Sequence, residues 1–359
     1  MLVRTWRNVV ANAVLLALGI TSALVVAELL TRVSWKPATP IVRSKPPNPE
    51  GLPELVTPFE LAEPNKRAIH DGKFWRTNSA GFRGPEVAEF PAPGTFRIVV
   101  AGDSITMGSG VLEEEAYVAV LESMLNAEAG GVHYEVLNLG LAGLNIEVVV
   151  NRLRDVGLRF HPDLVVYGFT LNDIEGPAYR SFTNGPYRAW HRRMAAAFDN
   201  SPFYLLRTVW PRWVSLRDVL APPPGSYEYE LDYNYFHNPA AWQDFLTQMD
   251  RLAAIGRDHG ICVNVLIHTT PHYLNFLHPF RRIYERVANA AVERGMTVSQ
   301  SFPVFRGHDG SSLALSAVDA HPNPAGHRLL AQALREGLRR LPAQCWARHE
   351  TRAMVQPPD

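Results

Sequence analysis

The hydrophobic pattern separates a long apolar N-terminal run from a globular part in which apolar and polar positions alternate. No charged residue occurs from Asn8 to Ala27, and the run from Ala13 to Ala27 is almost wholly apolar. About 20 such residues are enough to cross a bilayer as a helix. We therefore predict an uncleaved signal anchor, a transmembrane segment over residues 1–34. A signal peptide cleaved before Glu28 and a helix buried in a protein core are the alternatives.

The charges around this run bear on its orientation. Arg4 and Arg7 precede it, while Arg32, Lys36, Arg43 and Lys45 follow it, so the count of basic residues alone does not fix the topology. The short basic N-terminal region favours a globular part outside the cytoplasm, in the periplasm or cell envelope. Eight prolines between residues 36 and 64 predict an extended juxtamembrane linker, which we assign to residues 35–74.

Beyond residue 75 the pattern alternates between short apolar runs and segments with apolar residues at helical spacing. This alternation is typical of a parallel β-sheet covered by helices on both faces, an α/β fold. We expect one domain over residues 75–345, followed by a tail over residues 346–359. Strands are predicted at 96–101, 134–139, 164–169, 261–267 and 296–299, and helices at 113–125, 146–156, 239–259, 279–294 and 324–338.

An aromatic-rich segment over residues 175–238 interrupts this alternation. It contains Trp190, Trp210 and Trp213 together with many tyrosines, and we interpret it as an insertion that could act as a lid. Such side chains can stack on sugar rings or meet lipid headgroups. The pattern favours the alternative, in which they pack as a satellite hydrophobic cluster under a long loop.

Composition narrows the classes of function. The chain of 359 residues has 35 Lys+Arg against 35 Asp+Glu, which argues against a nucleic-acid partner because phosphate binding needs a cationic surface. The two cysteines, Cys262 and Cys345, have neither the spacing of a metal site nor that of a CxxC redox pair. We predict two unrelated thiols, with a single disulfide between them as the alternative.

The candidate chemistry lies where the predicted strands end. Ser104 follows the strand over 96–101 directly, in the sequence Gly-Asp-Ser, so its hydroxyl is expected at the carboxyl edge of the sheet. A serine there is either a helix cap or a nucleophile, and a nucleophile needs a base and donors for the oxyanion. The Ser104 and Gly143 backbone N–H groups and the Asn172 amide are candidate donors. His321 is the candidate base, with Asp319 to orient it.

These residues resemble the four ordered blocks of the SGNH, or GDSL, hydrolases. The blocks read GDSIT at Gly102 to Thr106, NLGLAG at Asn138 to Gly143, TLND at Thr170 to Asp173, and DAHPNPAGH at Asp319 to His327. The resemblance implies a flavodoxin-like three-layer α/β/α sandwich and an esterase or lipase that needs no metal or organic cofactor. It also implies that Ser104 is the nucleophile, Gly143 and Asn172 are oxyanion donors, and His321 is the base. The upstream segment NSAGFRG at Asn78 to Gly84 is similar to a membrane-associated bacterial branch.

Two positions depart from the family pattern. Thr170 stands where the third block usually has glycine, which leaves the Asn172 donor in place. Val318 stands where the family commonly has its acid, three residues before the histidine, so Asp319 is the substitute only if its carboxylate reaches the imidazole. Otherwise the site is a Ser–His dyad.

The sequence thus predicts a membrane-anchored serine esterase, whose partners are the membrane and an acyl ester of a glycan or lipid. An O-acyltransferase acting on envelope glycans and a catalytically silent glycan-binding or assembly protein are the alternatives. His268 and His272 follow a predicted strand, but a zinc site needs a third ligand. We interpret them as hydrogen-bonded loop histidines.

Overall fold

The computed structural model describes residues 2–34, 51–55, 57–70, 72–128, 130–179, 186–199, 201–271, 274, 278–316 and 319–346. These residues form two compact units, which we describe separately. The described residues within Met1–Val42 and Ser181–Glu230 make up the first unit, and those within Arg43–Arg180 and Leu231–Asp359 make up the second.

The second unit is built on a five-stranded parallel sheet. Its strand order is β4-β3-β5-β6-β7, so the chain starts inside the sheet, moves to one edge and then crosses to the other side. This is the flavodoxin-like order, and it confirms the predicted fold class. The strands are β3(Thr95–Gly102), β4(His133–Asn138), β5(Leu164–Phe169), β6(Cys262–Ile267) and β7(Thr297–Gln300).

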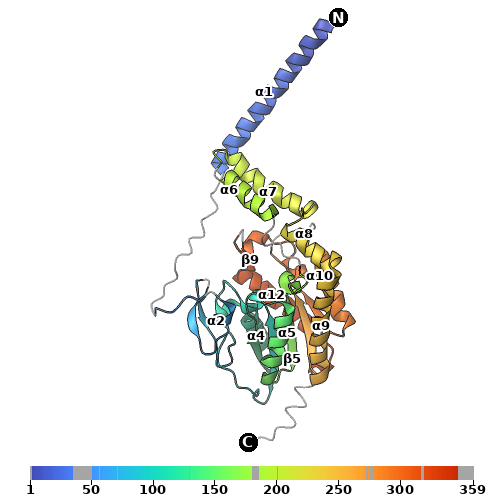
Figure 1. The fold of residues 1–359 in the computed structure, drawn as a ribbon. Coiled ribbons are helices and arrows are strands. Elements are labelled where there is room, and N and C mark those ends of the chain that lie inside the picture. The colour runs from blue at the N-terminus through green and yellow to red at the C-terminus, as the bar shows by residue number, and fades with distance from the viewer. Residues whose placement is uncertain are drawn as a thin grey trace. The chain divides into compact units, whose positions relative to one another are not determined.

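Helices cover both faces of this sheet because the strand residues alternate between two hydrophobic clusters. In β3, Val99 and Ala101 face one cluster, whereas Ile98 and Val100 face the other. The first cluster lies under α5(Ile146–Asp155), α9(Pro239–His259) and α10(Arg281–Glu293), and the second under α4(Tyr117–Glu128) and α12(Pro324–Leu338). Figure 1 shows α5 beside α9, which the contacts between these helices confirm.

Smaller elements complete this unit. They are α2(Pro58–Leu61), β1(Arg67–His70), β2(Lys73–Arg76), α3(Ser104–Met107), η1(Glu113–Glu115), η2(Gly157–Phe160), η3(Leu171–Ile174), η4(Tyr233–His237), α11(Phe302–Phe305), η5(Gly310–Ser312), β8(Ala314–Ser316) and β9(Asp319–Pro322). Residues 35–50 of the predicted linker lie outside the described residues. Its later part is folded, since α2, β1 and β2 bury Leu61 and Ala68 in the core.

The first unit contains α1(Leu2–Ser34), α6(Pro186–Asp199) and α7(Tyr204–Leu220), and α8(Tyr227–Asp232) follows at its boundary. Within α1, Val10–Ser34 has a mean hydropathy of 2.3, and among the described helices this one is long and apolar enough to cross a membrane. Such a segment is typical of a membrane anchor or a signal sequence. Figure 1 shows α6 and α7 side by side at the end of α1, in agreement with their contacts.

The aromatic residues of the 175–238 segment form a satellite cluster, as the favoured interpretation expects, but between two helices instead of under a loop. The Trp210 ring of α7 stacks on the Phe198 ring of α6 with 4.2 Å between centroids, and Trp190 meets the edge of Trp210 at 5.9 Å. The residues that join this segment to the second unit, 180–185, lie outside the described residues.

The prediction of two unrelated thiols is wrong. Cys262 at the start of β6 and Cys345 after α12 form a disulfide, with their Cα atoms 5.4 Å apart. Their separation of 83 residues concealed the pairing, because only the packing of α12 against the sheet brings them together. Disulfides persist mainly in oxidising compartments such as the periplasm and the cell exterior.

Candidate active site

The carboxyl ends of β3, β4 and β5 bring the first three sequence blocks to one edge of the sheet. β3 pairs with β4 through Val100 and Asn138 and with β5 through Gly102 and Gly168, and all three strands run in the same direction. The loops after them carry Ser104, Gly143 and Asn172, respectively. This is the edge at which parallel α/β sheets bind ligands.

Ser104 is the first residue of the short helix α3. The preceding Asp103 caps this helix, because its carboxylate accepts a hydrogen bond from the Ile105 N–H at 3.1 Å. Ser104 Oγ lies 3.2 Å from the other Asp103 oxygen. Burial raises the pKa of Asp103, while hydrogen bonds from Ile105, Asn172 and Thr170 oppose that shift. The serine therefore sits beside a carboxyl group held in place by the loops around it.

His321 and Asp319 lie on β9, which pairs with β8 as an antiparallel hairpin. His321 Nε2 is 2.8 Å from Ser104 Oγ, and His321 Nδ1 is 2.6 Å from Asp319 Oδ1. The same Asp319 oxygen accepts the His321 backbone N–H at 3.1 Å. The Asp319 carboxylate thus reaches the imidazole from two residues before it. Val318, the position where the family commonly has its acid, lies outside the described residues.

Asn323 fixes this hairpin to the helix that follows. Its side-chain oxygen caps α12 by accepting the N–H groups of Ala325 and Gly326. Its amide nitrogen donates to the carbonyls of Ser312 and Ala314. One side chain therefore joins the hairpin to α12, which is itself packed against α4 and β7.

The two other predicted site residues lie in the loops after β4 and β5. Gly143 has φ of +73°, a left-handed conformation that favours glycine. Asn172 lies in η3, and its side chain lowers the pKa of the Asp103 carboxyl, which places its amide next to the serine loop. In the same loop as Gly143, Gly140 leaves no room for a side chain, since a Cβ would lie 2.3 Å from the Met107 nitrogen.

A buried network holds the Thr170–Asp173 turn. Asp173 accepts hydrogen bonds from the Tyr167 hydroxyl at 2.5 Å and from the Thr170 backbone N–H at 2.9 Å. Burial raises the pKa of Asp173 well above its ordinary value, and the nearby Asp103 adds to that shift. Asp173, the fourth residue of the TLND block, therefore has a structural role: it orients the turn that carries Asn172.

The family of the chain follows from its sequence profile. The GDSL-like lipase/acylhydrolase family matches residues 100–329. The chain belongs to this family. It is accordingly an ester-hydrolysing enzyme, and the matched range contains Ser104, Gly143, Asn172, Asp319 and His321.

Comparisons with other proteins add only a general likeness. No curated protein sequence matches the chain. An alpha/beta hydrolase enzyme from the metagenome of Lake Arreo, Spain, is 18% identical with a TM-score of 0.42, over 69% of this chain and 97% of that one. The acetylxylan esterase of Geobacillus stearothermophilus is 16% identical with a TM-score of 0.42, over 68% and 94%. A putative lipolytic protein of the G-D-S-L family from Desulfitobacterium hafniense is 14% identical with a TM-score of 0.40, over 67% and 98%.

Arg83 is a supporting residue of this GDSL hydrolase that sequence reasoning did not single out. Its guanidinium donates to the carbonyls of Met107 at 2.9 Å, Gly108 at 2.7 Å and Val111 at 2.7 Å, all in the segment that ends and follows α3. The guanidinium also lies over the Trp75 ring at 4.5 Å. Burial lowers the pKa of Arg83 to about 10. The only signal for this role was the NSAGFRG segment itself.

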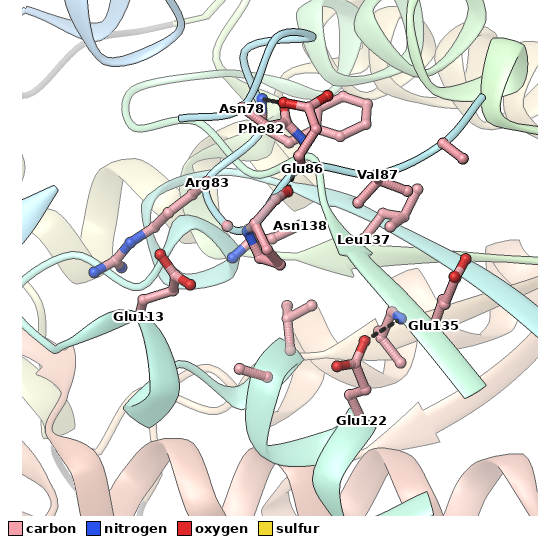
Figure 2. Close-up of a pocket in the computed structure, with 16 residues that line it drawn as sticks. Asn78, Phe82, Arg83, Glu86, Val87, Glu113, Glu122, Glu135, Leu137 and Asn138 are labelled. Atoms are coloured by element: carbon pink, nitrogen blue, oxygen red, sulfur yellow. Dashed lines mark hydrogen bonds between the residues drawn. The ribbon is translucent and has the colours of Figure 1, made fainter. Parts of the chain in front are cut away.

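Arg83 also borders a cavity of about 220 Å³ between the 78–88 segment, α4 and β4. Figure 2 shows Arg83 and Glu113 at one end of this cavity, and Glu122 and Glu135 at the other. The Glu122 carboxylate accepts the Val136 N–H at the free edge of β4, at 2.7 Å. Ser104 and His321 are not among the residues that line the cavity, so it is separate from the candidate active site.

The expectation that His268 is a hydrogen-bonded loop histidine is wrong in one respect. It lies in the loop after β6, but it is buried, and neither ring nitrogen has a hydrogen-bond partner among the described residues. Burial lowers the pKa of His268 to about 3 and that of the nearby buried His327 to about 3 as well. His272 lies outside the described residues. Within the described part of the chain, no group of three or more metal-ligating side chains is found.

These two histidines make stability depend on pH. A histidine that stays neutral in the folded state binds fewer protons than the unfolded chain below pH about 6.5, so its contribution is lost as the pH falls from there towards 3. Asp103 and Asp173 have raised pKa values, so their contribution to the free energy of unfolding increases as the pH falls. We therefore expect the free energy of unfolding of wild type, relative to His268→Leu, to fall by about 1 kcal/mol per pH unit as the pH is lowered from 6 to 4. Urea unfolding of both proteins measures this, and a pH-independent difference would contradict it.

Arg83→Lys tests whether the clamp on the α3 segment matters for catalysis. Lysine keeps the charge but loses the planar fork that serves three carbonyls, so the segment after Ser104 is less firmly placed. We expect kcat to fall by about 10- to 100-fold with little change in KM. The matched control is Arg76→Lys, because Arg76 pairs with Glu113 at the surface, away from α3. Equal kcat values for the two variants at a temperature where both are folded would disprove the role.

Proposed function

We propose that the chain is a membrane-anchored serine esterase in which Ser104, His321 and Asp319 form the catalytic triad. The continuous hydrogen-bond chain from Ser104 Oγ to His321 and on to Asp319, at 2.8 and 2.6 Å, carries this proposal. His321 Nε2 takes the serine proton as the oxygen attacks the ester carbonyl. Asp319 holds the imidazole with Nε2 towards the serine and stabilises the imidazolium that forms.

The oxyanion of the tetrahedral intermediate requires donors on the side away from His321. We assign these to the backbone N–H groups of Ser104 and Gly143 and to the side-chain amide of Asn172. The position of Asn172 beside Asp103, the residue before the nucleophile, supports this assignment, because an amide has two donor protons to offer at that place. Collapse of the intermediate expels the alcohol, which receives the proton from His321. Water then attacks the acyl-enzyme by the same route and releases the acid.

The location of the enzyme suggests its substrates. The apolar α1 and the Cys262–Cys345 disulfide together support an anchored enzyme outside the cytoplasm. Ester substrates at that surface include O-acetylated glycans and lipid esters. We propose these two classes from location, and the length of the acyl chain distinguishes them in the experiment below.

The test is hydrolysis of p-nitrophenyl acetate, butyrate and octanoate by the full chain in detergent. We expect Ser104→Ala and His321→Ala to lose activity by at least about 10³-fold, and Asp319→Asn to lose about 10²- to 10⁴-fold because asparagine favours the wrong imidazole tautomer. Asp309→Asn is the matched control and should keep full activity, because Asp309 is an exposed carboxylate before β8 that bonds Ser311 and not His321.

The acyl-chain profile separates the substrate classes, since a pocket for acetyl esters should reject octanoate. Equal rates for wild type and Ser104→Ala on all three esters would contradict the serine mechanism. Activity that appears only when a glycan acceptor is added, without release of free acid, would point to acyl transfer instead of hydrolysis.

A further inference from the structure

Helix α7 exposes an apolar stripe along one face. Residues spaced by three and four positions share a face of a helix, and here five of them are large, hydrophobic and 41 to 62% exposed. Soluble proteins seldom leave a continuous apolar surface of this kind uncovered. The stripe consists of Leu206, Val209, Trp213, Leu216 and Leu220.

The opposite side of α7 is already packed. Val214 is buried, and Trp210 stacks on Phe198 of α6. Asp218 accepts a hydrogen bond from the Tyr187 hydroxyl of α6 at 2.7 Å. The stripe is therefore not the face by which α7 packs on α6, and from Val209 to Leu220 it is left exposed.

The N-terminus of α7 is tied to α1 where the uncharged run of α1 ends. Glu28, the first charged residue after that run, accepts the backbone N–H groups of Tyr204 at 3.0 Å and Leu205 at 2.8 Å. Arg32, one turn further on, donates to the Pro202 carbonyl at 3.2 Å. If α1 spans a bilayer, α7 begins at the level where α1 leaves the hydrocarbon.

An apolar groove makes the stripe continuous with α1. The groove has a volume of about 490 Å³, and Leu206, the first residue of the stripe, lines it together with Leu24, Val25 and Leu29 of α1. The side chains of α1 that face this groove belong to the segment long and apolar enough to cross a membrane. A lipid layer that covers the exposed side chains of α1 at this level therefore also reaches Leu206, where the stripe begins.

The charges of α6 and α7 fit an anionic surface. The two helices carry six arginines against two aspartates. At 100° per residue, Arg212 falls beside the stripe and is exposed, so its long side chain can reach lipid phosphates while the apolar side chains enter the acyl region. Arg217, on the other flank, is paired with Asp218 at 2.6 Å. A second copy of the same helix would bring like charges together, which disfavours a dimer through this face.

We propose that α7 is an interfacial helix whose stripe inserts into the headgroup and acyl boundary of an anionic lipid bilayer. This inference rests on the membrane anchoring included in the proposed function. A helix with an apolar face, an exposed flanking arginine and a tryptophan has the composition of helices that lie in the plane of the interface. The first unit then contacts the bilayer twice, through α1 across it and through α7 along its surface.

The test places a fluorophore on the full chain in vesicles of phosphatidylcholine and phosphatidylglycerol. Both native cysteines are in the disulfide, so a single introduced cysteine is the only free thiol. An NBD label at Leu216→Cys reports on the stripe, and one at Leu16→Cys reports on α1. The matched control is Val292→Cys on α10, another exposed apolar position, at 61% exposure against 51% for Leu216.

We expect brominated lipids to quench the labels at positions 16 and 216, and aqueous iodide to quench the label at position 292 alone. If iodide quenches position 216 while position 16 stays within reach of the lipid, the anchoring stands and the interfacial helix is disproved. If position 216 is shielded from iodide without lipid quenching, and the shielding is lost at one chain per nanodisc, a second copy covers the stripe and the proposal is wrong. If position 16 is not quenched by lipid, the anchoring itself fails.

Discussion

The hydrogen bond between Ser104 Oγ and His321 Nε2 joins residues that are 217 positions apart in the chain, and the rest of the site is arranged around it. It requires the start of α3 and the β8–β9 hairpin to meet within a few tenths of an ångström. The parallel sheet places the start of α3, because β3 ends at the same edge as β4 and β5. Asn323 places the hairpin by bonding it to α12.

Buried polar groups make the serine loop rigid from several sides. Asp103 caps α3 from within the core, and Asp173 orients the turn that carries Asn172. Arg83 holds the carbonyls that follow α3, from a segment outside the range that the family profile matches. Such groups are costly to bury unless they are hydrogen bonded, so their bonds favour one arrangement of the loops. A catalytic site needs its side chains held in one geometry by such supporting hydrogen bonds.

The strands and long helices were predictable because their apolar periodicity is strong. The predicted limits of the 164–169 strand and of the 239–259 and 324–338 helices agree with β5, α9 and α12 to the residue. The β8–β9 hairpin was missed, since its strands are too short to show alternation, and with it the means by which Asp319 reaches His321. The disulfide and the Arg83 clamp were missed for another reason. Both join segments that are distant in sequence, and only the packed fold brings them together.

The same limits apply to α6 and α7. Their aromatic residues indicated a cluster, but the exposed stripe of α7 and its attachment to α1 through Glu28 emerge only when the helices are placed side by side. The apolar N-terminal helix, the disulfide and this surface are the features on which the proposed membrane anchoring depends. The catalytic unit itself carries the whole candidate triad, so its chemistry is testable independently of how the chain is anchored.

The most direct test of the central claim is covalent labelling of the full chain by a fluorophosphonate, followed by mass spectrometry of its peptides. A serine activated by His321 should bind one phosphonyl group per chain on Ser104, and His321→Ala should slow the labelling by at least about 10²-fold. Ser109→Ala, which changes a buried serine just beyond α3, should label as wild type does. Absence of labelling, or labelling at a serine other than Ser104, would contradict the account.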